Sequence, residues 1–159
     1  MNITAFPTKL SGRVTVPPSK SVAHRMVIAA ALSEGTSTIT NIYPSEDILA
    51  TMSCMRQLGA EIDFTGDMAE ITGIKDIPET AELDCGESGS TLRFLIPVAC
   101  ALGVKTTFKG RGRLPQRPIT PYLDEFPKHG ISFDYDNTMP FSVNGRLTGG
   151  KFYVDGGIS

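Results

Sequence analysis

The run Pro17–Ser21, PPSKS, stands before an apolar stretch and combines hydroxyl groups with a cation. Arg25 follows Ser21 by four residues, so a helix starting here would carry both on one face. The first N–H groups of a helix lack partners within it, and the helix dipole favours negative charge there. This corner predicts a phosphate or carboxylate site. The alternative is that the serines only cap the helix and that Lys20 and Arg25 are solvated.

A second corner, Cys85–Thr91, has the sequence CGESGST, and Arg93 follows in the first turn of a predicted helix. Its two glycines would let a ligand approach the backbone closely. The corner lacks the terminal GK[ST] of a P-loop, so an ordinary tight turn is the competing interpretation. The carboxylate of Glu87 argues against a purely anion-binding role.

Three arginines lie in the loop Gly110–Pro118, at positions 111, 113 and 117. Arg113 and Arg117 can bind a carboxylate or phosphate with two N–H groups at once, which lysine cannot do. Arg117 is the better candidate because it precedes Pro118, a residue type favoured in the first turn of a helix. The alternative is a solvated basic loop.

The other residues with titratable side chains suggest no catalytic group. His24 and His129 fall near no Ser or Cys nucleophile pattern, and packing on a helix face or surface exposure explains either one. Glu46 and Asp47 stand where a helix start favours acidic residues. The acidic residues show no metal-ligand spacing, so no metal site is predicted.

Composition narrows the class of protein. The chain has 159 residues, is 40% hydrophobic, and carries 15 Lys and Arg against 17 Asp and Glu. One compact domain is expected, and the slightly negative net charge argues against nucleic acid as the main ligand. A small anion needs only a few local cations and remains allowed.

Cysteine usage and hydropathy indicate a cytoplasmic protein. Cys54, Cys85 and Cys100 are odd in number and form no CxxC pair, so reduced thiols are expected rather than disulfides or a zinc site. The N-terminal residues lack the apolar core of a signal peptide, and no stretch reaches the roughly 18 apolar residues of a membrane span. We therefore expect no membrane partner.

These corners belong to a repeat. The stretches VTVPPSKS, LDCGESGS and YVDGGIS end at Ser21, Ser90 and Ser159, and successive serines are 69 residues apart. Helices, strands and closing glycines recur in the same order after the first two. The expected helices are Val22–Leu32, Ile48–Leu58, Thr91–Leu102 and Ile119–His129, and the expected strands include Thr36–Asn41, 60–64, 69–73, Val104–Lys109, 131–135 and 141–145. The second pair of helices is expected to be interrupted by Pro97 and Pro127.

The repeat predicts an α/β fold of β-α-β-α-β-β units, at about residues 14–82 and 83–151, with the start of a third at 152–159. Repeated units bury their apolar faces against neighbours, so a chain that stops inside a third unit is expected to be an incomplete domain of a longer protein.

Four ordered motifs resemble the N-terminal part of the 5-enolpyruvylshikimate-3-phosphate synthase family over the whole chain. PPSKSVAHR is similar to the family signature PSKSxxxR, and CGESGSTLRF to its N-x-G-T-x-x-R segment. LPQRPI resembles its RP loop, and VDGGIS the start of its DGSxSSQ segment. The resemblance implies the family's inside-out α/β barrel, in which each of two domains is built from three such units.

The resemblance also implies roles for single residues, which can be named by position. Lys20 would contact both substrates, shikimate 3-phosphate and phosphoenolpyruvate. The residues that would bind one substrate are Ser21, Arg25 and Ser159 for shikimate 3-phosphate, and Gly89 and Arg117 for phosphoenolpyruvate. Three further positions would support binding: Arg93, Ser90 and Glu87. Ser90 replaces the usual Thr of the family, and Glu87 stands where many members have Asn.

The implied reaction transfers the enolpyruvyl group of phosphoenolpyruvate to the 5-hydroxyl of shikimate 3-phosphate in the shikimate pathway, without a metal or organic cofactor. The family is the target of glyphosate, which competes at the phosphoenolpyruvate site. Its proton-transferring residues lie in the C-terminal domain, and its first stretch, here about Met1–Val16, belongs with that domain. We therefore expect this chain to be inactive alone and to need the C-terminal domain as its complement.

Two alternatives stay open at this point. The first is a sister enolpyruvyl transferase that acts on UDP-N-acetylglucosamine and shares the fold. It carries a K-N-A-A signature and a loop cysteine five residues before the RP arginine, whereas this chain has Ser19-Lys20-Ser21 and Gly112 at those places. The second is a non-catalytic anion-binding half-protein that needs a complementing C-terminal chain.

Overall fold

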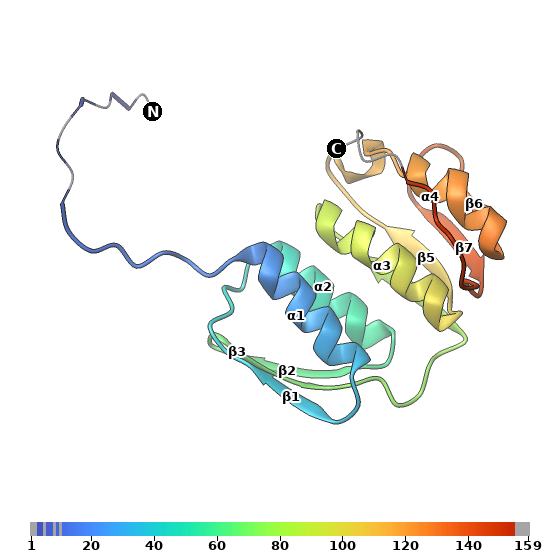
Figure 1. Cartoon of the computed structure of the whole chain (residues 1–159), viewed down its shortest axis with the longest axis horizontal. Coiled ribbons are helices and arrows are strands. Elements are labelled where there is room, and N and C mark those ends of the chain that lie inside the picture. The colour runs from blue at the N-terminus through green and yellow to red at the C-terminus, as the bar shows by residue number, and fades with distance from the viewer. Residues whose placement is uncertain (1–2, 5, 8, 10, 155–159) are drawn as a thin grey trace.

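Helices fill the middle of the molecule and two β-sheets flank them (Figure 1). The structure is a computed structural model that describes residues 3–4, 6–7, 9 and 11–154. The first sheet has three strands in the order β1-β3-β2, and the second has four in the order β4-β5-β7-β6. In β3 and β7, buried residues alternate with more exposed ones, as expected when only one face of a sheet is covered.

The first sheet and its two helices are formed by α1 (Lys20–Leu32), β1 (Thr36–Ile39), α2 (Glu46–Gln57), β2 (Glu61–Thr65) and β3 (Met68–Thr72). Both strand pairings in this sheet are antiparallel. The helices begin at serine N-caps, which satisfy an N–H group that the helix itself leaves unpaired.

The second sheet repeats this order with one strand added at its beginning. Its elements are β4 (Thr80–Asp84), α3 (Gly89–Leu102), β5 (Lys105–Lys109), the 3₁₀ turn η1 (Leu114–Gln116), α4 (Thr120–Glu125), the 3₁₀ turn η2 (Phe126–His129), β6 (Ile131–Asp134) and β7 (Phe141–Gly145). β4 pairs with β5 in parallel, and the other pairings are antiparallel. This is the predicted β-α-β-α-β-β order.

The first unit differs from the prediction at its beginning. Residues 13–18 form no strand, and the side chains of Val14 and Val16 are exposed. In the second sheet β4 lies beside β5, whereas the corresponding edge of β1 carries no fourth strand among the described residues. A lone extended segment has no partner for its backbone hydrogen bonds, so the alternation of apolar residues at 14–16 is not enough to make a strand.

Pro97 does not interrupt α3, which continues to Leu102 and ends at the left-handed Gly103. Proline lacks the N–H group that would donate to the carbonyl oxygen of Arg93. The hydroxyl of Tyr122 donates to that oxygen instead, at 2.9 Å, and so fills the gap. Pro127, by contrast, marks the point where α4 changes into η2, so the helix predicted over 119–129 is divided.

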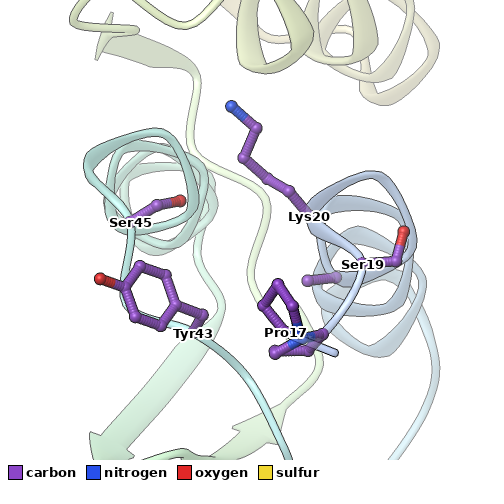
Figure 2. A pocket seen from close by; sticks show the side chains of 7 residues that line it. Pro17, Ser19, Lys20, Tyr43 and Ser45 are labelled. Carbon is purple, nitrogen blue, oxygen red and sulfur yellow. The ribbon is translucent and has the colours of Figure 1, made fainter. Parts of the chain in front are cut away.

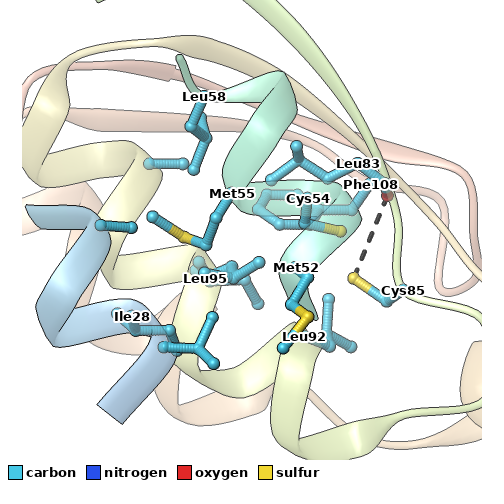
Figure 3. Close-up of a cluster of buried hydrophobic side chains, with 14 of the residues drawn as sticks. Ile28, Met52, Cys54, Met55, Leu58, Leu83, Cys85, Leu92, Leu95 and Phe108 are labelled. Atoms are coloured by element: carbon cyan, nitrogen blue, oxygen red, sulfur yellow. Dashed lines mark hydrogen bonds between the residues drawn. The ribbon is translucent and has the colours of Figure 1, made fainter. Parts of the chain in front are cut away.

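One apolar core joins both units. It includes Met52 and Met55 of α2, Leu92 and Leu95 of α3, and Phe108 of β5, all at most 2% exposed (Figure 3). The two units therefore share a core rather than having one each. No helix in the described part of the chain is both long and apolar enough to span a membrane.

Candidate functional site

Helices α1, α2 and α3 begin at the same end of the molecule (Figure 1). Each begins at a serine N-cap: the hydroxyl oxygens of Ser19 and Ser45 accept from backbone N–H groups at 3.4 Å, and that of Ser88 at 3.1 Å. The predicted first and second corners are the starts of α1 and α3. The structure thus brings three helix N-termini together, which concentrates unpaired N–H groups and positive dipole ends at one place.

At the first corner, Lys20 forms an ion pair although its side chain is exposed. Its Nζ lies 2.6 Å from Oδ2 of Asp47, a residue in the first turn of α2. Figure 2 shows Tyr43 and Ser45 on one side of the adjoining pocket and Pro17, Ser19 and Lys20 on the other. A small pocket therefore adjoins the ion pair at the starts of α1 and α2.

Arg25 is held in place from two sides. Its Nη1 donates to the carbonyl oxygen of Ser21 at 2.7 Å, and its guanidinium carbon lies 4.9 Å from the centre of the Phe94 ring in α3. This cation–π contact fixes a group that would otherwise be free in solvent. The arginine at the first corner is therefore positioned partly by the helix that starts at the second.

Arg117 lies against the start of α3. A Cβ built on Gly89 would overlap Nη1 of Arg117, so this approach is possible only at a glycine. The structure therefore brings together the two residues predicted for phosphoenolpyruvate, although they are far apart in the sequence. The predicted reason for the placement of Arg117 is wrong, because α4 begins only at Thr120 and Arg117 instead follows η1, where its N–H donates to Leu114.

Glu87 contributes to the shape of the arginine loop. A Cβ on Gly112 would overlap the Glu87 carboxylate, and the positive φ of Gly112, +60°, is a second reason for glycine there. The neighbouring Arg111 donates its backbone N–H to Gly86 at 2.8 Å, and its guanidinium lies 3.6 Å from Glu46. The corner Cys85–Thr91 and the loop Gly110–Pro118 therefore pack as one surface.

The predicted binding residues at this end are largely accessible. The side chains of Lys20, Ser21, Arg25, Ser90, Arg93 and Arg117 are exposed, whereas Gly89 is buried beneath Arg117. Ser159 lies outside the described residues. The carboxyl groups of Glu46, Asp47 and Glu87 lie among these cations, so the local charge is mixed and Lys20 is already partly neutralised.

A buried polar cluster that no sequence pattern predicts lies below this surface. Nδ1 of His24 lies 2.7 Å from Oγ1 of Thr51, which lies 2.7 Å from Oγ1 of Thr91, and Thr91 in turn is 2.7 Å from Oγ of Ser88. Burial lowers the pKa of His24, an effect that Lys20 and Arg25 reinforce and Asp47 opposes. No local signal reveals the cluster because its members are 27 and 40 residues apart.

The cysteines are free and buried. The hydrogen bond with Cys54, together with burial, raises the pKa of Cys85 far above its usual range, and burial raises that of Cys100 to about 12. A thiol reacts as its thiolate, so neither is a nucleophile at neutral pH. Within the described residues, no group of three or more His, Cys, Asp and Glu side chains could hold a metal ion.

The amino-acid sequence matches one protein family over almost its whole length. A family model described as EPSP synthase (3-phosphoshikimate 1-carboxyvinyltransferase) matches residues 5–159. The 3-phosphoshikimate 1-carboxyvinyltransferase of Clostridium beijerinckii is 44% identical over 167 residues, covering 99% of this chain and 38% of that protein. Its counterpart in Clostridium perfringens strain SM101 is 45% identical over 156 residues, covering 96% and 37%. The chain thus spans less than two fifths of these relatives.

Solved structures of enolpyruvyl transferases are also similar to this chain. EPSP synthase from Acinetobacter baumannii superposes with a TM-score of 0.74 at 28% identity, over 86% of this chain and 32% of that one. The enolpyruvyl transferase NikO from Streptomyces tendae has a TM-score of 0.52 at 16% identity, over 84% and 32%, and bears on the fold alone. The predicted enolpyruvyl transferase fold is confirmed. Because the family model covers nearly the whole chain, this protein belongs to the EPSP synthase family.

Proposed function

We propose that this chain forms the part of an enolpyruvyl transferase that binds shikimate 3-phosphate and phosphoenolpyruvate. One observation carries the proposal: Lys20, Arg25 and Arg117 all lie at the end of the molecule where three helices begin. Both ligands carry a phosphate and a carboxylate, so binding them requires several cations and N–H donors together. Lys20, Ser21 and Arg25 would hold shikimate 3-phosphate, with Ser159 as a further predicted contact.

Phosphoenolpyruvate would lie at the start of α3, over the contact between Gly89 and Arg117, where the guanidinium and the helix N–H groups can both donate to it. Ser90 and Arg93 are exposed in the same first turn and would support it. A fixed set of donors stabilises developing negative charge without reorganising during the reaction. The transfer itself would join the enolpyruvyl carbon to the 5-hydroxyl of shikimate 3-phosphate and release phosphate.

The ion pair between Lys20 and Asp47 gives this site a further property. Asp47 holds the ammonium group between the starts of α1 and α2, ready for an incoming anion. A phosphate that binds Lys20 has to share or replace this carboxylate. Binding should therefore weaken with added salt, which screens exposed charges.

The binding proposal is tested by isothermal titration calorimetry with shikimate 3-phosphate and, separately, with phosphoenolpyruvate. Lys20→Ala and Arg25→Ala should weaken the first ligand, and Arg117→Ala the second, by about 1.5–3 kcal/mol if the contact is desolvated and by less in an open site. Lys105→Ala is the matched control, because Lys105 begins β5 next to the C-terminal end of α3. Equal heats for wild type and all variants would refute the proposal.

We also propose that the chain is inactive by itself. The resemblance assigns the proton-transferring residues to the C-terminal domain, which would complete the site when the two come together. Phosphate release from both substrates should stay at background with this chain alone, and appreciable turnover would contradict this proposal while leaving the binding proposal intact.

The three free thiols fit a reducing compartment, and we propose the cytoplasm as the place of action.

A further inference from the structure

The buried cluster below the site connects three helices. His24 comes from α1, Thr51 from α2, and Thr91 from α3, whose N-cap is Ser88, and all four are at most 1% exposed. The hydroxyls of Thr51 and Thr91 also both lie 3.2 Å from the backbone carbonyl oxygen of Asp47, the residue whose carboxylate holds Lys20. The cluster therefore touches the start of α2 and the cap of α3 at the same time.

The hydroxyl groups alone cannot supply all of these hydrogen bonds. Ser88, Thr51 and Thr91 each carry one hydroxyl proton. A proton is needed for each contact among these hydroxyls, for each contact with the Asp47 carbonyl and for the contact with His24. If Nδ1 of His24 were a bare acceptor, Thr51 would have to spend its only proton on the ring. If Nδ1 carries a proton, His24 becomes a donor, and the hydroxyl proton of Thr51 is free for Thr91 or Asp47.

The surroundings of Nε2 favour the second arrangement. Nε2 of His24 is buried and has no hydrogen-bond partner among the described residues. A neutral imidazole protonated there would bury an unpaired N–H, and orphaned buried donors are rarer than under-used acceptors. Burial lowers the pKa of His24 and so keeps the ring neutral. The charges of Lys20 and Arg25 also lower this pKa, whereas the charge of Asp47 raises it.

We propose that neutral His24, protonated on Nδ1, is a positioning residue that fixes the start of α3 against α1 and α2 through Thr51 and Thr91. It touches no substrate. Its effect would be transmitted to Gly89, the residue after the Ser88 cap, and so to the place where Arg117 lies. This inference rests on the binding function proposed above for its effect on affinity, but the state of His24 can be measured without a ligand.

The first test is the tautomer of His24, read from two- and three-bond ¹⁵N–¹H correlations in the uniformly ¹⁵N-labelled chain at pH 7. The expected spectrum has a protonated Nδ1 and an unprotonated Nε2 for His24. His24→Asn assigns the signals, since the one remaining histidine is His129. A ring protonated on Nε2 alone, or on both nitrogens, would overturn the proposal.

The second test uses a matched pair of substitutions. In His24→Asn the side-chain amide can place an N–H where Nδ1 stands, whereas His24→Leu fills the space without a donor. Hydrogen exchange of the Thr91 amide, which donates to Ser88, should stay slow in His24→Asn and become at least about tenfold faster in His24→Leu, a loss of about 1.4 kcal/mol. Equal exchange in the two variants would refute the positioning role.

Affinity separates positioning from general stability. The dissociation constant for phosphoenolpyruvate should rise about tenfold in His24→Leu and stay within about twofold in His24→Asn. Ile71→Val, in the core of the first sheet, is the control that lowers stability without touching the cluster. If the wild-type chain binds no phosphoenolpyruvate, the proposed function fails, while the tautomer and the Thr91 exchange still decide the role of His24.

Discussion

The contact between Gly89 and Arg117 shows how a missing side chain lets an arginine lie against the start of a helix. The guanidinium of Arg117 occupies the space that a Cβ on Gly89 would take. Gly89 is the first residue of α3 and its φ is not in the left-handed region, so the backbone conformation does not require glycine there. The need for glycine comes from the close approach of Arg117 alone.

The substitution Gly89→Ala should therefore leave the fold intact but displace Arg117. We expect the stability to change by no more than about 0.5 kcal/mol, because an arginine side chain at the surface can move aside. The affinity for phosphoenolpyruvate should fall by up to about 1.5–3 kcal/mol, the value of a charge-assisted contact, as measured by calorimetry.

Gly149→Ala is the matched control for this change, since nothing lies within 4 Å of a Cβ built there. It should bind phosphoenolpyruvate like the wild type. If Gly89→Ala bound as tightly as this control, Arg117 would not act from the position seen here.

At the scale of elements, α3 depends on a residue outside itself. Pro97 leaves the carbonyl oxygen of Arg93 without its helical donor, and the Tyr122 hydroxyl of α4 supplies one at 2.9 Å. The ring of Tyr122 is packed edge-on against Phe126, and burial raises the pKa of its hydroxyl, so it stays protonated and able to donate. One hydrogen bond thus connects α3 to α4.

Tyr122→Phe keeps the ring and removes this bond. We expect a loss of about 1 kcal/mol in the free energy of unfolding, measured in urea, because a carbonyl oxygen loses its donor. The loss should shrink when Pro97→Ala is also present, because the restored backbone N–H can then donate to Arg93. Equal losses in both backgrounds would show that Tyr122 stabilises the chain in another way.

The first unit shows what happens when such an outside partner is missing. Residues 14–16 alternate as a strand should, yet they stay extended and exposed because no neighbouring strand pairs with them. β4 also alternates between exposed and more buried residues, but it lies beside β5, which supplies parallel hydrogen bonds along its whole length. Alternation therefore indicates a tendency to form a strand, and the partner decides whether one forms.

At the scale of the whole molecule, the shared core predicts one cooperative unit. Leu95 of α3 is fully buried in the cluster that also contains Met55 of α2. Leu95→Ala should cost about 2–5 kcal/mol, through the lost transfer energy and the cavity that remains. Because the core is continuous, we expect amide protection in β3 and β7 to fall together.

Hydrogen exchange followed by NMR provides the measurement. Leu49→Ala, at a partly exposed position of α2, is the control and should lower protection much less. If Leu95→Ala reduced protection in β7 while β3 kept that of the wild type, the two sheets would be separate folding units and the common core would not couple them.

The sequence by itself determined the features that depend on neighbours along the chain. Serine caps, closing glycines and the 69-residue spacing located the starts of α1 and α3 to within two residues, because capping and helix termination are local interactions. The family followed from four local motifs. Even Arg117 was recognised as a candidate, although for a reason that the structure corrects.

Only the tertiary structure decided which of these groups meet. The pairing of Lys20 with Asp47, the contact of His24 with Thr51, and the position of Arg117 on Gly89 all join residues at least 27 positions apart. Such contacts depend on how α1, α2 and α3 pack over the shared core, and no pattern within one element encodes that arrangement. The residue types therefore predict an affinity for anions, while the packing of three helix starts decides where the proposed site lies.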